Sequence, residues 1–423
     1  MLKYELKKIF CKRLNRGLLL ATLVLAFVFS AFAIGSFQYT DEEGTVHSGL
    51  TAPRKLIADK DRWEGEITPE RLEEIIQLDQ SVSGITGQAS NETYGKYVQS
   101  YSDILNAASS ILYDTADVQD GTGQDGESAE TSMQDVYGVL YADGSTVDSL
   151  YDIYSQNMQG YVQVYGKTPR QQEFLQKIYS RIQTPLEYEV PDSWSTEMSY
   201  STTYGLIVIM VEGFLAAGIF SEDYRYKAAP VFFASRLGRD KAVWNKILAG
   251  YLVATVVYWG FVLLQAAISF SVMGTSGAHT LYQFSCPYSI YVMTYAQMYR
   301  MLLFGGYIAS LLAASVSMLA AALTRSMNIA VCLPFLLFCV SPFIGRALPF
   351  HTFFTLTPDQ LTNILQCVKS PNIYQVFGIV FRQVPFLIGF YLLVSLCLLP
   401  AVYQAFRRPA GSQRRPSGGN KFF

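Results

Sequence analysis

Long apolar stretches alternate with polar segments along the 423-residue chain. A helix needs about 20 mostly apolar residues to cross about 30 Å of hydrocarbon, and six stretches meet or approach that length. They predict six transmembrane helices, at 17–37, 203–220, 247–273, 301–324, 326–345 and 383–406. We expect the last helix to start near Phe377. The pattern predicts an all-α polytopic membrane protein with one large segment between its first two spans.

The first apolar stretch has a second interpretation, because basic residues precede it as they do in a signal peptide. Its apolar run is longer than a typical signal core, and no clean small-residue cleavage site follows it. We therefore expect the stretch to be retained as the first transmembrane helix.

The polar segment 38–202 is predicted to form a mainly helical extracytoplasmic domain. Pro69 and Pro169 each open a run with helical spacing, and proline favours the first turn of a helix. Weaker helical periodicity extends over 98–113 and 147–164.

Two amphipathic segments flank the spans. Residues 1–16 place apolar side chains on one helical face and basic ones on the other, which predicts a cytoplasmic helix in the membrane interface. The alternative for this segment is a plain orientation signal without a helix. Near 346–376, aromatic residues mixed with polar ones predict short helices at the outer interface.

Charge is divided unequally along the chain, although the net charge is only −2. Residues 38–203 carry 28 acidic and 10 basic residues, and the rest of the chain has a net charge of +16. Basic residues gather in 1–16, in the loop 221–246 and in the tail 407–423, as they do in cytoplasmic segments of membrane proteins. We therefore expect both termini in the cytoplasm and the segment 38–202 outside, in the plasma (cytoplasmic) membrane of a bacterium.

Composition supports a membrane protein and offers little catalytic chemistry. Half of the residues are hydrophobic and 16% are charged, against about 25% charged in soluble domains. The nearest approach to a nucleotide-binding loop, at Lys167-Thr168, has Tyr161 where the motif needs its first glycine. No cysteine or histidine spacing is typical of a metal site. We predict a chain that is not an enzyme and holds no cofactor or metal itself.

Glu212 is the one ionisable residue well inside a predicted span. An intramembrane carboxyl is costly, and it often marks a transport path. We treat Glu212 and Gln265 of the third span as candidates for that path, and Gln265 is also the candidate hydrogen-bond partner of Glu212. The alternative is a protonated or hydrogen-bonded carboxyl with a structural role. Cys286 and Cys367, the cysteines of the predicted outer loops, form either one disulfide or two free thiols.

The loop after the second span carries the most specific family signal. Glu222 ends that span, a short helix is predicted over 226–233, Ser235-Arg236 follows, and Lys246 opens the third span. This order resembles the permeases of type 2 ABC exporters. The wider layout is similar too: an amphipathic start, six spans, a large outer insertion and short outer helices before the last span.

The likeness is incomplete at two places. Where that family commonly has Gly-Thr after the Glu and a Pro before the Ser-Arg, this chain has Lys227-Ala228 and Ala234.

The resemblance implies a permease subunit that receives work from a separate cytoplasmic ABC ATPase, which binds ATP and Mg. The short cytoplasmic helix would dock on the ATPase, whose closure would tilt the spans as rigid bodies. The residues expected in this coupling loop are Glu222, Arg225, Lys227, Arg236, Arg239, Lys241 and Lys246. The alternative is that their cations only satisfy the orientation rule.

The same resemblance implies the other partners. Two copies, or this chain and a related permease, would enclose a path in the lipid bilayer for a hydrophobic or amphipathic substrate such as a peptide, drug or lipid-like molecule. No nucleic acid is expected as a partner.

Three other classes of function stay open. A membrane sensor whose extracytoplasmic domain binds a ligand would explain the size of that domain but not the six spans. A membrane-embedded enzyme would need a catalytic pair at membrane depth. A secondary transporter usually has more spans, often as repeats, and this chain has no internal repeat.

Overall fold

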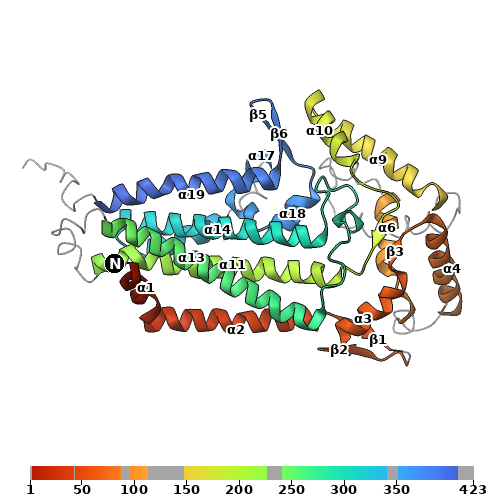
Figure 1. Ribbon diagram of the computed structural model, residues 1–423, viewed down its shortest axis with the longest axis horizontal. Coiled ribbons are helices and arrows are strands. Elements are labelled where there is room, and N and C mark those ends of the chain that lie inside the picture. Colours follow the sequence, from red (N-terminus) through yellow and green to blue (C-terminus); the bar gives the residue numbers. More distant parts are fainter. Residues whose placement is uncertain are drawn as a thin grey trace, which may run out of the picture.

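Five long helices form the frame of the protein in its computed structural model, which describes residues 2–41, 43–86, 96–112, 147–225, 241–340 and 351–407. Each is long and apolar enough to cross a membrane. They are α2 (Arg13–Gly35), α11 (Asp192–Arg225), α13 (Lys241–Met273), α14 (Tyr295–Thr324) and α19 (Gln383–Arg407). They lie side by side in one bundle (Figure 1). The prediction of a mostly helical, polytopic membrane protein is confirmed.

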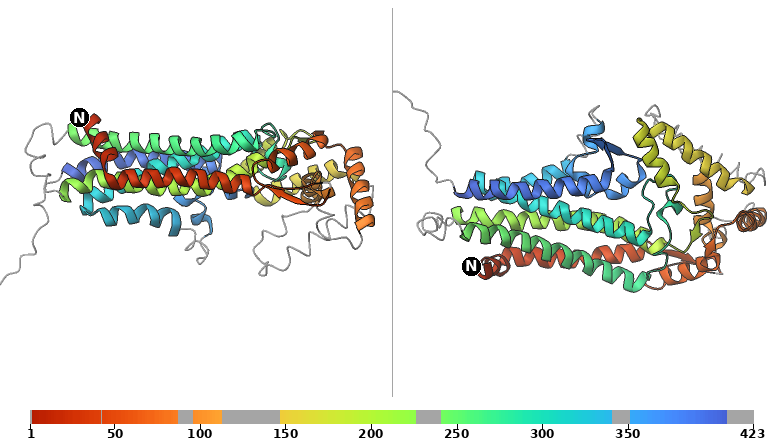
Figure 2. Two further views of the ribbon diagram at one scale, coloured as in Figure 1. Left: turned by 90° about the horizontal axis from the view of Figure 1, so that it is seen from below. Right: turned by 45° about the horizontal axis from the view of Figure 1, so that its top comes forward.

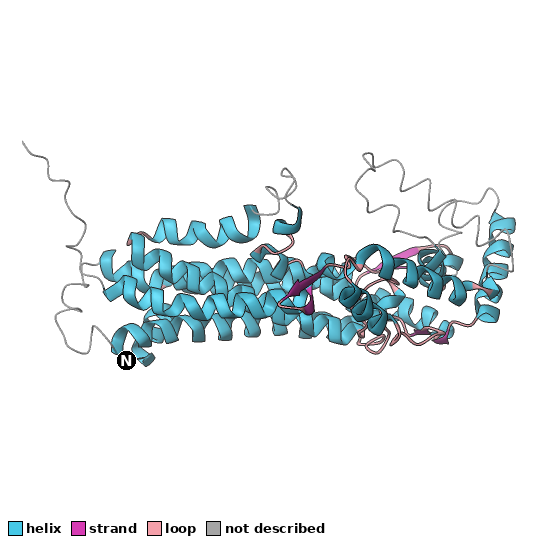
Figure 3. Cartoon of the chain, turned by 90° about the horizontal axis from the view of Figure 1, so that it is seen from above, coloured by secondary structure: helices cyan, strands magenta, loops and turns pink. Residues whose placement is uncertain are grey.

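The predicted span 326–345 is described only to Val340. It forms α15 (Met327–Phe335), which continues as a five-residue π-helix, Leu336–Val340. The nine and five residues of these two pieces extend about 21 Å at 1.5 Å per residue, less than the hydrocarbon thickness. Pro334, inside α15, lacks the backbone donor that a regular helix needs. α15 lies along one side of the bundle (Figure 2, left), and a sixth span stays a prediction. Helices dominate the described chain, with a few short strands among them (Figure 3).

Helix α11 is the central element of the bundle. It packs against α2, α13, α14 and α15. Small side chains allow these close approaches. A Cβ at Gly213 would lie 3.1 Å from Pro334 Cγ and 3.3 Å from Ser317 Oγ. With 34 residues, α11 is about 51 Å long, so it extends well beyond the predicted span 203–220 at both ends.

The described residues between α2 and α11, here called the insert domain, cover one end of the bundle (Figures 1 and 2). The predicted helix starts at Pro69 and Pro169 are confirmed, and a capping box of Thr168 and Gln171 fixes the second. The helices are α3 (Ala52–Lys60), α4 (Pro69–Thr86), α6 (Ser102–Leu112), α9 (Leu150–Tyr165) and α10 (Pro169–Tyr179). Two small antiparallel sheets pair β1 (Gln38–Thr40) with β2 (Val46–Ser48), and β3 (Gly65–Glu66) with β4 (Glu187–Tyr188).

The segment before α19 combines short helices with a hairpin. The described helical pieces are α17 (His351–Phe354), the 3₁₀ turn Pro358–Leu361 and α18 (Ile364–Lys369), as the short-helix prediction requires. Strands β5 (Ile373–Val376) and β6 (Ile379–Arg382) follow. The expectation that the last span starts near Phe377 is wrong, because Phe377 lies in the hairpin turn and α19 begins at Gln383.

The bundle has two different ends. Helix α1 (Leu2–Cys11), the last turns of α11 and α19 and the start of α13 share the N-terminal end, opposite the insert domain (Figure 1). We call the two ends the N-terminal end and the domain end.

Candidate functional site

Charged side chains from three helices and one linker meet at the N-terminal end. We call this group the terminal ion cluster; its members are Glu5, Lys8, Lys12, Glu222, Asp223 and Lys246. Glu5 and Lys8 belong to α1, Lys12 joins α1 to α2, and Lys246 belongs to α13. The two remaining acids lie in the last turn of α11.

Lys246 and Asp223 form the centre of the cluster. Lys246 is only 1% exposed, and its Nζ lies 2.7 Å from Asp223 Oδ2 and 3.3 Å from Glu5 Oε1. The other Asp223 oxygen, Oδ1, accepts from Lys8 Nζ at 2.9 Å. Asp223 therefore joins α13 to α1 through both of its carboxylate oxygens.

Glu222 makes a second connection between α11 and the N-terminal segment. It pairs with Lys12, and Lys8 Nζ lies 4.0 Å from its Oε2. Both lysines are partly exposed, and their contacts with Glu222 place the end of α11 beside the N-terminal segment.

The apolar face of α1 also contributes to this contact. Ile9 is buried, and Leu6 and Phe10 pack partly against the bundle core. The predicted amphipathic helix is confirmed over Leu2–Cys11. Its apolar face was expected in the membrane interface, but Leu6, Ile9 and Phe10 lie against the ends of the bundle helices. The reason is that α11 and α13 present acids and a lysine complementary to those on α1.

The predicted coupling-loop residues have different positions. Glu222 and Lys246 are in the cluster, whereas Arg225 ends α11 and Lys241 begins α13 with exposed side chains. The other three lie outside the described residues: Lys227, Arg236 and Arg239. Sequence reasoning missed Asp223 and the α1 partners, although two adjacent acids beside a basic loop gave a signal.

Glu212 lies buried between helices, 1% exposed. Ser310 of α14 donates a hydrogen bond to its Oε2, and its Oε1 has no hydrogen-bond partner among the described residues. Gln265 as its partner is wrong, because α11 and α13 run antiparallel and bring Gln265 opposite Glu197, nearer the domain end.

Glu197 and Gln265 belong to a separate buried group. Glu197 is fully buried and accepts from Ser201 Oγ at 2.7 Å, from Gln265 Nε2 at 3.2 Å and from the Tyr299 hydroxyl at 3.3 Å. Ser30 of α2 donates to the backbone carbonyl of Gln265 at 3.1 Å. This group links four helices. It was missed because Glu197 precedes the apolar stretch and was assigned to the extracytoplasmic domain.

A buried ion triad connects the insert domain to α11. Lys60 Nζ of α3 lies 2.6 Å from Asp103 Oδ2 of α6 and 2.6 Å from Asp192 Oδ2, in the first residue of α11. Burial lowers the pKa of Lys60, but the two carboxylates outweigh it and raise that pKa above its usual value.

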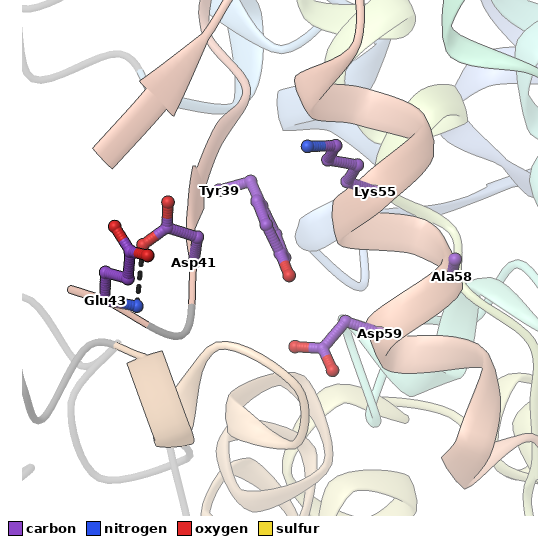
Figure 4. A pocket seen from close by; sticks show the side chains of 6 residues that line it. All are labelled: Tyr39, Asp41, Glu43, Lys55, Ala58 and Asp59. Carbon is purple, nitrogen blue, oxygen red and sulfur yellow. Dashed lines mark hydrogen bonds between the residues drawn. The ribbon is translucent and has the colours of Figure 1, made fainter. Parts of the chain in front are cut away.

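An open depression of about 540 Å³ lies in the insert domain between β1 and α3 (Figure 4). Its lining residues are Tyr39, Asp41, Glu43, Lys55, Ala58 and Asp59. Asp41 accepts from the backbone N–H groups of Glu43 and Thr45 at 2.9 Å. A hydrogen bond from His47 lowers the pKa of Asp41. The Asp41 carboxylate of this depression thus already has hydrogen-bond partners in its own turn.

Cys286 and Cys367 are free thiols in the structure, so the disulfide alternative is not formed. The Cys367 thiol donates to Gln360 Oε1 at 3.2 Å. Burial raises the pKa of Cys286 to about 11 and that of Cys367 to about 12, which makes both unreactive near neutral pH.

Within the described ranges, no group of three or more His, Cys, Asp or Glu side chains could hold a metal ion. No known family, curated protein or solved structure matches this chain.

Proposed function

We propose that this protein is the membrane-spanning permease subunit of an ATP-driven exporter, which works with a separate cytoplasmic ATPase. The terminal ion cluster carries the proposal. It ties the two helices that flank the loop 226–240 to each other and to α1. A partner that pushes on this loop would therefore move α1, α11 and α13 together.

The length of α11 supports the same proposal. One uninterrupted helix joins the terminal ion cluster to the Lys60 triad at the domain end. Ion pairs at both ends make α11 suited to pass a displacement from a cytoplasmic ATPase to the insert domain.

The exporter would enclose its substrate path in a homodimer, or in a heterodimer with a related permease. Glu212 is a candidate residue of that path, because it is a buried carboxyl with an unpartnered oxygen among the described residues. A hydrophobic or amphipathic substrate fits a path lined by apolar helices.

The test is co-purification of the tagged full chain with an ABC ATPase from the cells that naturally produce it. Arg236→Glu and Lys241→Glu reverse cations on and beside the loop, whereas Lys177→Glu reverses an exposed cation of α10 in the insert domain. We expect the first two to lower ATPase recovery about tenfold, which corresponds to about 1.4 kcal/mol, and the third to leave it unchanged. Equal recovery with all three variants would remove the loop as the docking site.

A membrane sensor is the second candidate, and the open depression between β1 and α3 favours it. In this case α11 would carry a ligand signal from the insert domain to the N-terminal end. A sensor needs no ATPase, so normal signalling in cells that lack any co-purifying ATPase would favour it over the exporter.

A further inference from the structure

The turn of the β5–β6 hairpin exposes an aromatic side chain to solvent. Phe377 is fully exposed, at 102% of its reference area, and Ile379 beside it is 60% exposed. Val376 pairs with Ile379, so the loop has two residues, Phe377 and Gly378, with φ of 50° and 82°. A two-residue turn with both φ values positive normally has Asn-Gly. Phenylalanine there is unfavourable for the backbone and exposes a ring, and such strain often marks a functional position.

Aromatic rings continue from the hairpin onto the exposed side of α19. Phe386 in the first turn of α19 lies 5.7 Å from Tyr374 and 6.0 Å from Phe381, measured between ring centroids. It stacks with Phe390 at 6.1 Å. Phe390 is exposed, as is Leu393 one turn further. The hairpin and the exposed face of α19 are therefore one continuous apolar surface.

The insert domain holds the hairpin from its other side. Arg170 Nη1 donates to the Gly378 carbonyl at 3.1 Å, and Thr168 Oγ1 donates to Gln375 Oε1 at 3.0 Å. These contacts from the start of α10 fix the turn and leave the Phe377 ring exposed.

We propose that the β5–β6 hairpin is a membrane-contact element whose Phe377 tip inserts between lipid headgroups at the domain end. The hairpin joins α19 directly and points away from the bundle beside α19 (Figure 1), so it runs roughly along the membrane surface. Aromatic side chains are favoured at the boundary between headgroups and acyl chains. Lipid is the occupant because this surface continues the exposed apolar side of a helix that is long and apolar enough to cross a membrane.

The proposal predicts the depth of a spin label at residue 379, beside the Phe377 tip. Nitroxides would be placed singly on a cysteine-free full chain in phosphatidylcholine–phosphatidylglycerol vesicles. Leu393→Cys on α19 gives the hydrocarbon reference, and Glu74→Cys on α4, exposed in the insert domain, gives the water reference. We expect the ratio of oxygen to nickel-chelate accessibility at Ile379→Cys, which keeps Phe377 in place, to lie several-fold above the Glu74 value. A ratio equal to that at Glu74 overturns the proposal, as does spin–spin broadening that shows a second copy at the tip.

A second variant separates anchoring from folding. Phe377→Asn restores the favoured Asn-Gly turn, so the hairpin should keep its structure and the protein its melting temperature. A nitroxide at Ile379 should then lose most of its excess oxygen accessibility. An unchanged ratio at Ile379 in the Phe377→Asn protein would show that the phenylalanine does not anchor the hairpin.

Discussion

The buried acidic residues of α11 have two different kinds of partner. Asp223 is matched by Lys8 and Lys246 at 2.9 and 2.7 Å. Glu197 and Glu212 receive hydrogen bonds from uncharged groups and have no ion-pair partner among the described residues. An ionised carboxylate is very costly in an apolar interior unless a cation lies beside it. The two kinds of site therefore differ in what it costs to keep the carboxyl ionised. The acids matched by lysines are suited to structure, and the unmatched Glu212 is suited to function.

Glu212→Gln tests this distinction. Gln has nearly the same shape and keeps an acceptor for Ser310, so we expect a change in stability below about 1.5 kcal/mol and unchanged expression. If Glu212 belongs to the export path, efflux of amphipathic fluorescent compounds from cells should fall about tenfold, a barrier increase of about 1.4 kcal/mol.

Ser310→Ala is the control for this change. It removes the hydrogen bond to Glu212 and keeps the carboxyl, so it should lower the melting temperature more than Glu212→Gln does. Export at the normal rate by the Glu212→Gln protein would leave this residue a structural role only.

At the scale of elements, the ion triad attaches α3 and α6 to the first turn of α11. Lys60 is 5% exposed and contacts both acids at 2.6 Å. Lys60→Met would leave Asp103 and Asp192 facing each other without their cation. Breaking a buried ion pair costs about 3–5 kcal/mol, so the insert domain of this variant should be cut much faster by a protease at neutral pH.

The same triad predicts an alkaline loss of stability. The folded protein holds the pKa of Lys60 above its unfolded value of 10.5. The charged Lys60 therefore stabilises the folded state fully below pH 10.5, and this stabilisation is lost as the pH rises through the folded pKa. Proteolysis rates of wild type and Lys60→Met should differ by a constant factor between about pH 7 and about pH 10 and converge above it. A constant factor throughout the alkaline range would contradict this assignment.

Sequence periodicity predicted the long helices well. It predicted the ends of the helices and the hairpin before α19 poorly. Five of the six apolar stretches correspond to long helices, since length and hydropathy are local properties. The start of α19 was placed too early because residues 377–382 are apolar enough to resemble the start of a span, although Phe377 and Gly378 form a hairpin turn. The helix α11 was placed too short because its first turns carry Asp192 and Glu197, whose partners come from distant segments.

The candidate site was predicted only in part for the same physical reason. Glu222 and Lys246 were selected from their places beside the loop. Their pairing with α1 joins residues more than 200 positions apart, which no local pattern reveals. Gln265 was matched to Glu212 by residue type alone, and the antiparallel packing of α11 and α13 gave it a different partner.

At the scale of the whole molecule, charge and shape follow one axis. The insert domain occupies one end of the bundle, and the acidic segment 38–203 carries a net charge of −18. The basic N-terminal segment lies at the opposite end, together with the last turn of α19. Basic segments stay preferentially in the cytoplasm, so this arrangement favours one orientation in the membrane.

That orientation predicts opposite labelling of two engineered cysteines. On a cysteine-free background, Glu74→Cys in the exposed face of α4 should react with a membrane-impermeant maleimide on intact cells. Lys3→Cys in the exposed face of α1 should react only after the cells are permeabilised. Both positions are exposed, so a difference in rate reports the side of the membrane and not burial. The reverse pattern would place the terminal ion cluster outside the cell, where no ATPase could reach the loop 226–240, and the exporter proposal would fail together with the topology.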